Sequence, residues 1–253
     1  MRILTIIPAR YASTRFPGKP LAKIGDKEMI LHVLERASRI SPSLYVATDD
    51  ERIASCVRQA GYEAIMTSSD LRSGTERCIQ AYERLGQEAD ILVNLQGDEP
   101  FIAAEHIELL LSAFEDPEVD IATLAQPFGE ECSDEELENP NAVKVVRGQR
   151  GQALYFSRSV IPYLRGAQEG WARQHRYLKH IGLYAFRTKI LPQLQQLPDS
   201  PLELAESLEQ LRWLDAGYRI QVQYTELGTV GIDTPEDLEE LSALILERGH
   251  MQD

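Results

Sequence analysis

The sequence predicts an α/β fold: a doubly wound, mostly parallel sheet flanked by helices. Short apolar runs that are typical of buried strands alternate with apolar positions at helical spacing. The 253 residues are also long enough to bury a sizeable core. Beyond Phe114 the alternation becomes less regular, which indicates an added antiparallel lobe at about 140–190. We expect one domain over residues 1–253 that contains this lobe.

The first hundred residues or so carry the regular alternation. Apolar runs predict strands at Arg2–Ile7, Ser43–Ala47, Glu63–Met66 and Ile91–Leu95. Helical spacing predicts helices around Met29–Ala37, Ile53–Val57 and Cys78–Leu85. Asp49 and Asp50 follow the second strand, and their simplest role is to cap the helix that comes next.

The remaining elements are expected in a mixed order. A helix over Ile107–Phe114 precedes strands at Ile121–Ala125, Val143–Val146 and Ala153–Phe156, and Gly148 and Gly151 predict a hairpin between the last two. A helix over Leu202–Ala216 should end at Gly217, with Leu204, Leu208, Leu211 and Leu214 near one face. A strand at Gln221–Tyr224 and a helix from Pro235 to about Arg248 complete the prediction.

Composition excludes several classes of partner. Lys and Arg total 26 against 40 Asp and Glu, and a formal charge of −14 argues against nucleic acid and anionic membrane surfaces. Cys56, Cys78 and Cys132 form no C-x-x-C pair, so we expect a reducing cytoplasm and no zinc site. No signal peptide or membrane span is expected, because no apolar stretch reaches the roughly 18 residues that a span needs.

The loop after the first strand is basic in an otherwise acidic chain. Arg10, Arg15 and Lys19 can together oppose several phosphate charges, Ser13 can donate a hydrogen bond, and Gly18 permits close backbone approach. Neither of the common phosphate-loop patterns, G-x-x-x-x-G-K-[ST] or G-x-G-x-x-G, occurs there. The loop therefore indicates a polyphosphate site, although an ordinary solvated loop has the same composition.

Two aspartates are candidate metal ligands. Asp98 follows a strand in Asn94-Leu95-Gln96-Gly97-Asp98-Glu99-Pro100, where ligands of open α/β sheets bind, but Gly97-Asp98 also suits a plain turn. Asp233 lies in Gly231-Ile232-Asp233-Thr234-Pro235-Glu236-Asp237 and could equally be a helix N-cap. The segment Arg72-Ser73-Gly74-Thr75-Glu76-Arg77 could likewise contact a base or simply begin a helix.

These motifs, in this order, resemble the sugar cytidylyltransferases, most closely those that use 3-deoxy-manno-octulosonate (KDO). The resemblance runs from Ile7 through Asp237 and rests on Pro8-Ala9-Arg10-x-x-Ser13-x-Arg15-x-Pro17-Gly18-Lys19-Pro20-Leu21, N-x-Q-G-D-E-P and G-I-D-T-P-E-D. It implies a nucleotide-diphosphosugar-transferase-like, Rossmann-like fold and a homodimer. It also implies CTP-binding residues, which are Pro8, Ala9, Arg10, Ser13, Arg15, Lys19, Ser73, Gly74, Arg77 and Gln96.

The same resemblance implies the reaction. CTP and KDO would give CMP-KDO and pyrophosphate for lipopolysaccharide synthesis, with Lys19, Arg10, Asp98 and Asp233 as catalytic residues and the two aspartates holding Mg²⁺. Sugar contacts would come from Gln96, Arg158, His180, Tyr184, Glu209 and Gln210.

Alternatives stay open for several of these roles. His180 and Tyr184 could be structural, and Glu209 and Gln210 would by default be exposed. The sugar could be an 8-amino-KDO analogue, a sialic acid or a sugar 1-phosphate, and a nucleotide sensor without turnover is the rival from another class.

Overall fold

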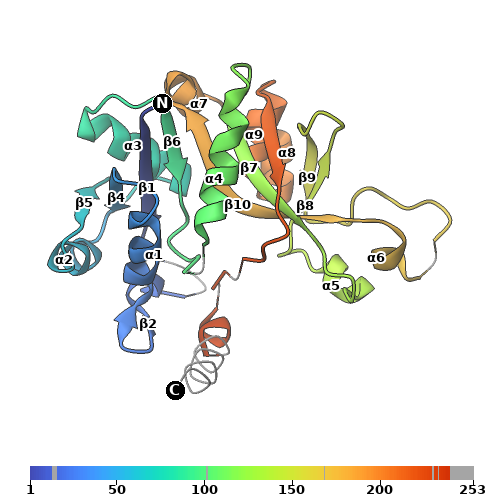
Figure 1. The fold of residues 1–253 in the computed structure, drawn as a ribbon, viewed down its shortest axis with the longest axis horizontal. Coiled ribbons are helices and arrows are strands. Elements are labelled where there is room, and N and C mark those ends of the chain that lie inside the picture. Colours follow the sequence, from blue (N-terminus) through green and yellow to red (C-terminus); the bar gives the residue numbers. More distant parts are fainter. Residues whose placement is uncertain (13–15, 101, 168, 230, 233, 240–253) are drawn as a thin grey trace. The chain divides into compact units, whose positions relative to one another are not determined.

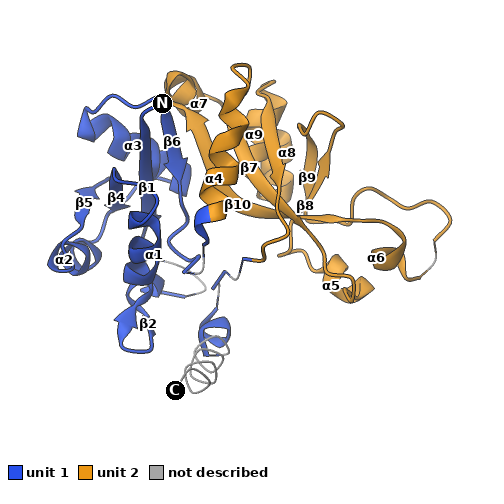
Figure 2. Ribbon diagram, in the orientation of Figure 1, with its two compact units in different colours: residues 1–104, 229–253 blue, residues 105–228 orange. Residues whose placement is uncertain are grey.

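The computed structural model describes residues 1–12, 16–100, 102–167, 169–229, 231–232 and 234–239. The chain divides into two compact units (Figure 2). Unit 1 comprises residues 1–104 and 229–253, and unit 2 comprises residues 105–228. The single-domain organisation stays a prediction.

Unit 1 contains four parallel strands. They are β1 (Ile3–Ala9), β4 (Leu44–Thr48), β5 (Glu63–Met66) and β6 (Ile91–Asn94), in the sheet order β6-β1-β4-β5 (Figure 1). β1 is central: Ile6 is opposite Tyr45 of β4 on one side and Asn94 of β6 on the other. All four strands lie within two residues of their predicted bounds, so the parallel half of the prediction is confirmed.

Three helices connect these strands, namely α1 (Met29–Ser38), α2 (Glu51–Gln59) and α3 (Gly74–Leu85). A one-turn helix, η1 (Lys19–Leu21), and a small hairpin of β2 (Lys23–Ile24) and β3 (Lys27–Glu28) precede α1. The chain moves outward from β1 to β4 and β5, then returns to place β6 on the other side of β1. The loops after β1 and β6 therefore diverge, and such a reversal of strand order is where open α/β sheets bind ligands.

Unit 2 carries the mixed part of the fold. Its strands are β7 (Ile121–Pro127), β8 (Lys144–Arg147), β9 (Ala153–Ser157), β10 (Leu178–Arg187) and β11 (Ile220–Tyr224). β11 pairs with β7 in parallel, whereas β7–β10, β10–β8 and β8–β9 are antiparallel. The β8–β9 hairpin turns through Gly148 and Gly151 as predicted, with Gly151 at φ +84°. The predicted antiparallel lobe is therefore present.

The helices of unit 2 are mostly short. They are α4 (Ala104–Ser112), which begins at the last residue of unit 1, α5 (Asp134–Glu138), α6 (Trp171–Gln174), α7 (Leu191–Gln195), α8 (Pro201–Glu206) and α9 (Gln210–Asp215), with the one-turn helices η2 (Ala113–Glu115) and η3 (Thr188–Ile190). Phe186 of β10 packs edge to face on the buried Trp213 of α9. Aromatic contacts therefore anchor α9 to the sheet.

The single helix predicted over Leu202–Ala216 is wrong. The chain breaks between α8 and α9 at Ser207, which adopts a left-handed φ of +52°. The carboxylate of Glu206 accepts hydrogen bonds from the Ser157 hydroxyl and the Arg158 amide, which ties the end of α8 to β9. The break leaves Leu204 67% exposed while Leu211 is fully buried. Gly217 does end α9, since its amide donates to the Leu214 carbonyl.

A helix begins at Pro235, as predicted, and its continuation towards Arg248 lies outside the described residues. In the part of the chain that the structure describes, no helix is long and apolar enough to cross a membrane.

Candidate active site

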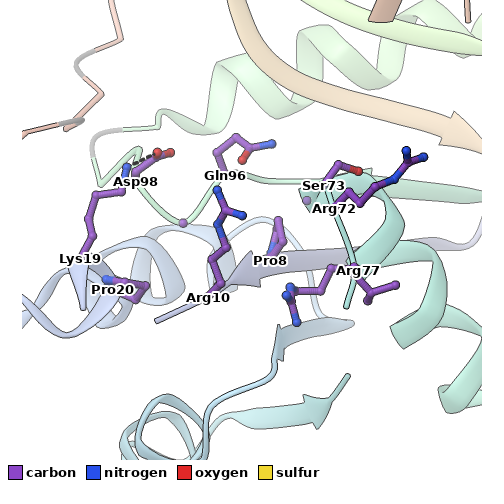
Figure 3. A pocket seen from close by; sticks show the side chains of 13 residues that line it. Pro8, Arg10, Lys19, Pro20, Arg72, Ser73, Arg77, Gln96 and Asp98 are labelled. Atoms are coloured by element: carbon purple, nitrogen blue, oxygen red, sulfur yellow. Dashed lines mark hydrogen bonds and ion pairs between the residues drawn. The ribbon is translucent and has the colours of Figure 1, made fainter. Parts of the chain in front are cut away.

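A pocket of about 250 Å³ lies in unit 1 where the loops after β1 and β6 diverge. The end of β1, the start of η1, the residues that lead into α3 and the turn after β6 form its wall (Figure 3). The lining residues are Pro8, Ala9, Arg10, Lys19, Pro20, Leu71, Arg72, Ser73, Gly74, Arg77, Gln96, Gly97 and Asp98.

Most of the predicted nucleotide-binding residues therefore share one pocket. Ser13, Arg15 and Asp233 lie outside the described residues. The residues predicted for the site did not include Leu71, Arg72, Pro20 or Gly97. Arg72, Pro20 and Gly97 could have been predicted, because they belong to the motifs that indicated the site. Leu71 lies outside these motifs, and nothing in the sequence marked it as a pocket residue.

The pocket wall is packed closely around Pro8. A Cβ atom on Gly74 would lie 3.2 Å from Cγ of Pro8, and one on Gly97 would lie 3.2 Å from the Pro8 carbonyl oxygen. Such contacts are tighter than ordinary van der Waals distances, so a larger residue at either position would push the loops apart. Glycine at 74 and 97 allows three segments to meet at the end of β1.

Lys19 and Asp98 face each other within the pocket. The ammonium of Lys19 donates to Oδ2 of Asp98 at 2.6 Å and to the carbonyl of Ile232 at 2.9 Å (Figure 3). Both side chains retain contact with solvent, at 16% for Lys19 and 30% for Asp98. The ion pair thus places a cation and a carboxylate where a ligand can still reach them.

Arg77 is the most buried cation of the pocket, with 3% of its side chain exposed. Its guanidinium donates to Asp49 at 3.1 Å, to the Ser68 carbonyl at 3.3 Å and to the hydroxyl of Thr67. A buried charge is stable only when it is paired in this way. Asp49 therefore holds Arg77 in place, and its sequence context did not predict this role. Asp50, by contrast, caps α2 as expected and accepts from the Arg52 amide.

Ser73 and Gln96 connect the pocket to the helix α3 and the strand β6. The Ser73 hydroxyl accepts from the Glu76 amide at 3.1 Å, so Ser73 is the N-cap of α3 and also lines the pocket. The Gln96 amide donates to Asn94 at 3.4 Å, and Asn94 in turn donates to Thr75 at 3.3 Å. The helix-start role weighed for Ser73 is confirmed without excluding a ligand role.

The donors of the pocket fit a divalent cation that arrives with phosphates. Among the described residues, no three His, Cys, Asp or Glu side chains gather into a metal cluster. Mg²⁺ commonly takes only one or two carboxylates and fills its octahedral shell with water and substrate phosphate. Asp98, beside cationic side chains that suit phosphate, matches such a partial donor set.

The N-cap role weighed for Asp233 belongs to its neighbour. The Thr234 hydroxyl accepts from the Asp237 amide at 3.2 Å, and the Asp237 carboxylate accepts from the Thr234 amide at 2.8 Å. This reciprocal pair satisfies the first turn of the helix that begins at Pro235. Asp233 is therefore not needed as the cap.

Unit 2 contains the predicted sugar-binding residues other than Gln96. Nε2 of His180 lies 3.0 Å from the Thr123 hydroxyl, and the His180 ring packs against Phe156 and Tyr184. Burial lowers the pKa of His180 to about 3, so its imidazole is neutral at physiological pH. Tyr184 is 6% exposed, and its hydroxyl has no hydrogen-bond partner of normal geometry among the described residues. Burial also raises the pKa of this tyrosine.

The remaining predicted sugar residues are less exposed than expected. Gln210 is 6% exposed and Glu209 is half-buried, so the expectation that both are exposed to solvent is wrong. The reason is that α9 is a separate helix that begins after the break at Ser207. The Arg158 guanidinium donates to three backbone carbonyls: Glu206 at 2.7 Å, Pro140 at 2.9 Å and Ser207 at 3.3 Å. Arg158 thus ties β9 to α8, and two of its five N–H groups remain for other contacts.

Comparisons with known proteins identify the family of the chain. The cytidylyltransferase family profile matches residues 4–221. The chain is 56% identical to a 3-deoxy-manno-octulosonate cytidylyltransferase of Porphyromonas gingivalis, over 98% of each chain. It is 45% identical to the Escherichia coli protein of that name, over 97% of each.

Solved structures give the same result. The structure of CMP:2-keto-3-deoxy-manno-octonic acid synthetase complexed with CTP superimposes with a TM-score of 0.88 at 44% identity, and the match covers 98% of this chain and 100% of the other. A putative glucose-1-phosphate thymidylyltransferase from Bacillus anthracis, at 15% identity and a TM-score of 0.63, shares the fold alone. The chain belongs to the cytidylyltransferase family and, within it, to the 3-deoxy-manno-octulosonate cytidylyltransferases.

Proposed function

We propose that the protein joins CTP to KDO, releasing CMP-KDO and pyrophosphate for lipopolysaccharide synthesis. The observation that carries the proposal is the pocket in unit 1, in a chain similar over its full length to enzymes named for this reaction. In the reaction the anomeric hydroxyl of the sugar attacks the α-phosphate of CTP, and pyrophosphate leaves. One P–O bond forms as another breaks, and the proton of the attacking hydroxyl is released, so no covalent enzyme intermediate is required.

The cationic side of the pocket binds the triphosphate. Arg10 and Lys19 oppose its negative charge together with Arg15, and Ser13 of the same loop donates a hydrogen bond. Figure 3 shows Arg10 rising from the end of β1 in the direction of Gln96. Pre-organised cations stabilise the charge that develops on the transferring and departing phosphates, so catalysis is mostly positioning and electrostatics.

The other wall binds the nucleoside. The Ser73 hydroxyl, the close approach at Gly74 and the amide of Gln96 suit the hydrogen-bonding edge of cytosine, while Pro8 and Ala9 support the ring. Arg77 is held by Asp49, so its remaining N–H groups approach the base from a fixed direction. A fixed donor discriminates between bases better than a mobile one.

We assign Asp98 and Asp233 to Mg²⁺. The contact with Lys19 uses one oxygen of the Asp98 carboxylate, and carboxylate oxygens are the ligands that Mg²⁺ prefers. When bound, the metal ion neutralises phosphate charge and orients the attacking and leaving groups. With Mg²⁺ at Asp98, the ammonium of Lys19 would contact the neighbouring phosphates.

For the sugar we propose Gln96, Arg158, His180, Tyr184, Glu209 and Gln210. The neutral imidazole of His180 and the buried hydroxyl of Tyr184 suit hydroxyl groups of a sugar, and the free N–H groups of Arg158 suit its carboxylate.

We also propose a homodimer and a cytoplasmic location. Free thiols at Cys56, Cys78 and Cys132 support the latter.

A pyrophosphate-release assay tests the proposed function. CTP and Mg²⁺ are supplied with KDO, its 8-amino analogue, a sialic acid and a sugar 1-phosphate in turn. We expect the highest kcat/KM with KDO. Preference for the 8-amino analogue or a sialic acid would move the enzyme to a related acidic sugar, and activity only with UTP, GTP or a sugar phosphate would reject the assignment.

A further inference from the structure

Tyr11 and Gly18 join the two ends of the basic loop. The Gly18 amide donates to the Tyr11 carbonyl at 2.8 Å. Gly18 has a left-handed φ of +74°, and a Cβ atom there would lie 3.1 Å from ring carbons of Tyr11. The Tyr11 ring is therefore packed directly on the Gly18 backbone, and glycine is needed both for the backbone conformation and for the contact.

Arg52, in the first turn of α2, covers this ring. Its guanidinium carbon lies 3.3 Å from the centroid of the Tyr11 ring. Nε and Nη2 of Arg52 donate to the two carboxylate oxygens of Asp50 at 2.9 and 2.6 Å. The same carboxylate caps α2, so the plane of the guanidinium is fixed to the start of that helix. A planar cation held in this way stacks well on an aromatic face.

Arg52 does not line the nucleotide pocket, but it acts on the residue next to a lining residue. Gly18 immediately precedes Lys19, whose ammonium contacts Asp98. The Gly18 carbonyl also accepts from the Leu21 amide at 2.8 Å, which closes the one-turn helix η1. A contact path therefore runs from α2 through the Tyr11 ring and Gly18 to Lys19.

We propose that Arg52 is a positioning residue for the nucleotide triphosphate, acting by holding Tyr11 against Gly18. The inference rests on the proposed function, since it takes the basic loop to be the phosphate-binding segment. Ordering a loop before the ligand arrives removes an entropic cost from binding. Without Arg52 the Tyr11 ring loses its outer contact, the two ends of the loop separate more readily, and Lys19 is presented to phosphate less often.

Calorimetric binding of CTP and of inorganic tripolyphosphate to the full chain tests this role. Arg52→Ala should weaken both ligands about two- to five-fold, the factor that corresponds to a solvent-exposed cation–π contact. The KM for CTP should rise by a similar factor while the KM for KDO is unchanged. Arg58→Ala is the matched control, because it removes another exposed ion pair of α2, with Glu51, that does not touch Tyr11.

Variants at Tyr11 separate positioning from a loss of surface charge. Tyr11→Leu should weaken binding as Arg52→Ala does, the double variant should be no weaker than either single variant, and Tyr11→Phe should recover most of the lost affinity. Arg52→Lys keeps the charge but not the planar fork, so it should also bind less tightly. Thermal unfolding of each variant checks that the fold is retained.

Any of three results would overturn the proposal. Arg52→Ala could bind tripolyphosphate as tightly as Arg58→Ala does, or Arg52→Lys could bind it as tightly as wild type. In the third, the losses of binding free energy in Arg52→Ala and Tyr11→Leu would add up in the double variant. The binding measurements with tripolyphosphate do not depend on turnover. Wild-type protein that releases no pyrophosphate from CTP and KDO would reject that function, whereas the tripolyphosphate measurements would still decide the role of Arg52.

Discussion

Lys19 and Asp98 carry opposite charges at 2.6 Å in a pocket that ligands can reach. A single ion pair that keeps contact with solvent contributes about 1 kcal/mol or less to the free energy of unfolding. Its value therefore lies in function: the cation suits phosphate and the carboxylate suits a metal ion. The two groups hold each other in place until a ligand binds.

Replacing Asp98 by Asn should remove activity and spare the fold. Asn keeps an oxygen that accepts from Lys19 but loses the negative charge that attracts Mg²⁺. We expect kcat for pyrophosphate release to fall on the order of 10²-fold or more, with an unchanged urea midpoint. Asp26→Asn, at an exposed position in the turn between β2 and β3, is the control. Turnover near that of wild type would remove Asp98 from the metal site.

His180 should make stability depend on pH. Its pKa is about 3 in the folded protein because of burial, against about 6.5 when unfolded. Below pH 6.5 the unfolded chain therefore binds a proton that the folded chain does not, and stability falls as the pH decreases towards 3. At pH 5 the loss is about 1–2 kcal/mol, since the residue keeps some contact with solvent.

Urea unfolding between pH 7 and pH 5 measures this effect. His180→Gln places a side-chain amide near the Thr123 hydroxyl and does not titrate, so the stability of this variant should change less with pH than that of wild type. His175→Gln, at an exposed position, should keep the wild-type dependence. If the free energy of unfolding changed equally with pH in wild type and in both variants, His180 would not be held neutral in the folded protein.

Three elements meet at Pro8 because glycine leaves room for them. β1 ends there, α3 begins at Gly74, and the turn after β6 passes at Gly97. The pattern of apolar runs predicted these elements closely, since parallel strands buried on both faces have a strong sequence signal. The sequence did not predict that the loops of these elements lie close together, because this depends on contacts between segments far apart in the chain.

Gly74→Ala tests that closeness. Alanine favours the start of α3, but its Cβ would lie 3.2 Å from Pro8, so the wall of the pocket must shift. We expect a KM for CTP raised several-fold with little change in thermal stability. Gly129→Ala, where a Cβ would meet nothing within 4 Å, should leave both unchanged. A Gly74→Ala enzyme with wild-type KM would show that the wall tolerates the methyl group.

The break between α8 and α9 shows where prediction from sequence failed at this scale. Leu204, Leu208 and Leu211 have helical spacing, and no Gly or Pro interrupts them. The helix ends because Glu206 bonds to Ser157 and Arg158 of β9, which are distant in sequence. The same break buries Gln210, so a tertiary contact determined the surroundings of a predicted site residue.

At the scale of the whole molecule, the order of the strands explains where the pocket of unit 1 lies. β1 is the turning point of the parallel sheet in unit 1, and the pocket lies at the loops that diverge from it. Most of the residues that the motifs predicted for CTP line one pocket, because each motif lies on a loop directly after a strand or before a helix. The residues that we propose for the sugar, apart from Gln96, belong to unit 2, where irregular topology weakens the sequence signal.

The central claim is that the enzyme transfers the cytidylyl group of CTP to KDO by attack at the α-phosphorus. Phosphorus NMR of CTP and KDO with Mg²⁺ and the enzyme tests it most directly. We predict that the α-phosphorus becomes a phosphodiester to the sugar while the other two appear as pyrophosphate, in a one-to-one ratio. Formation of CDP with a phosphorylated sugar, or of inorganic phosphate without a CMP-sugar, would contradict the account.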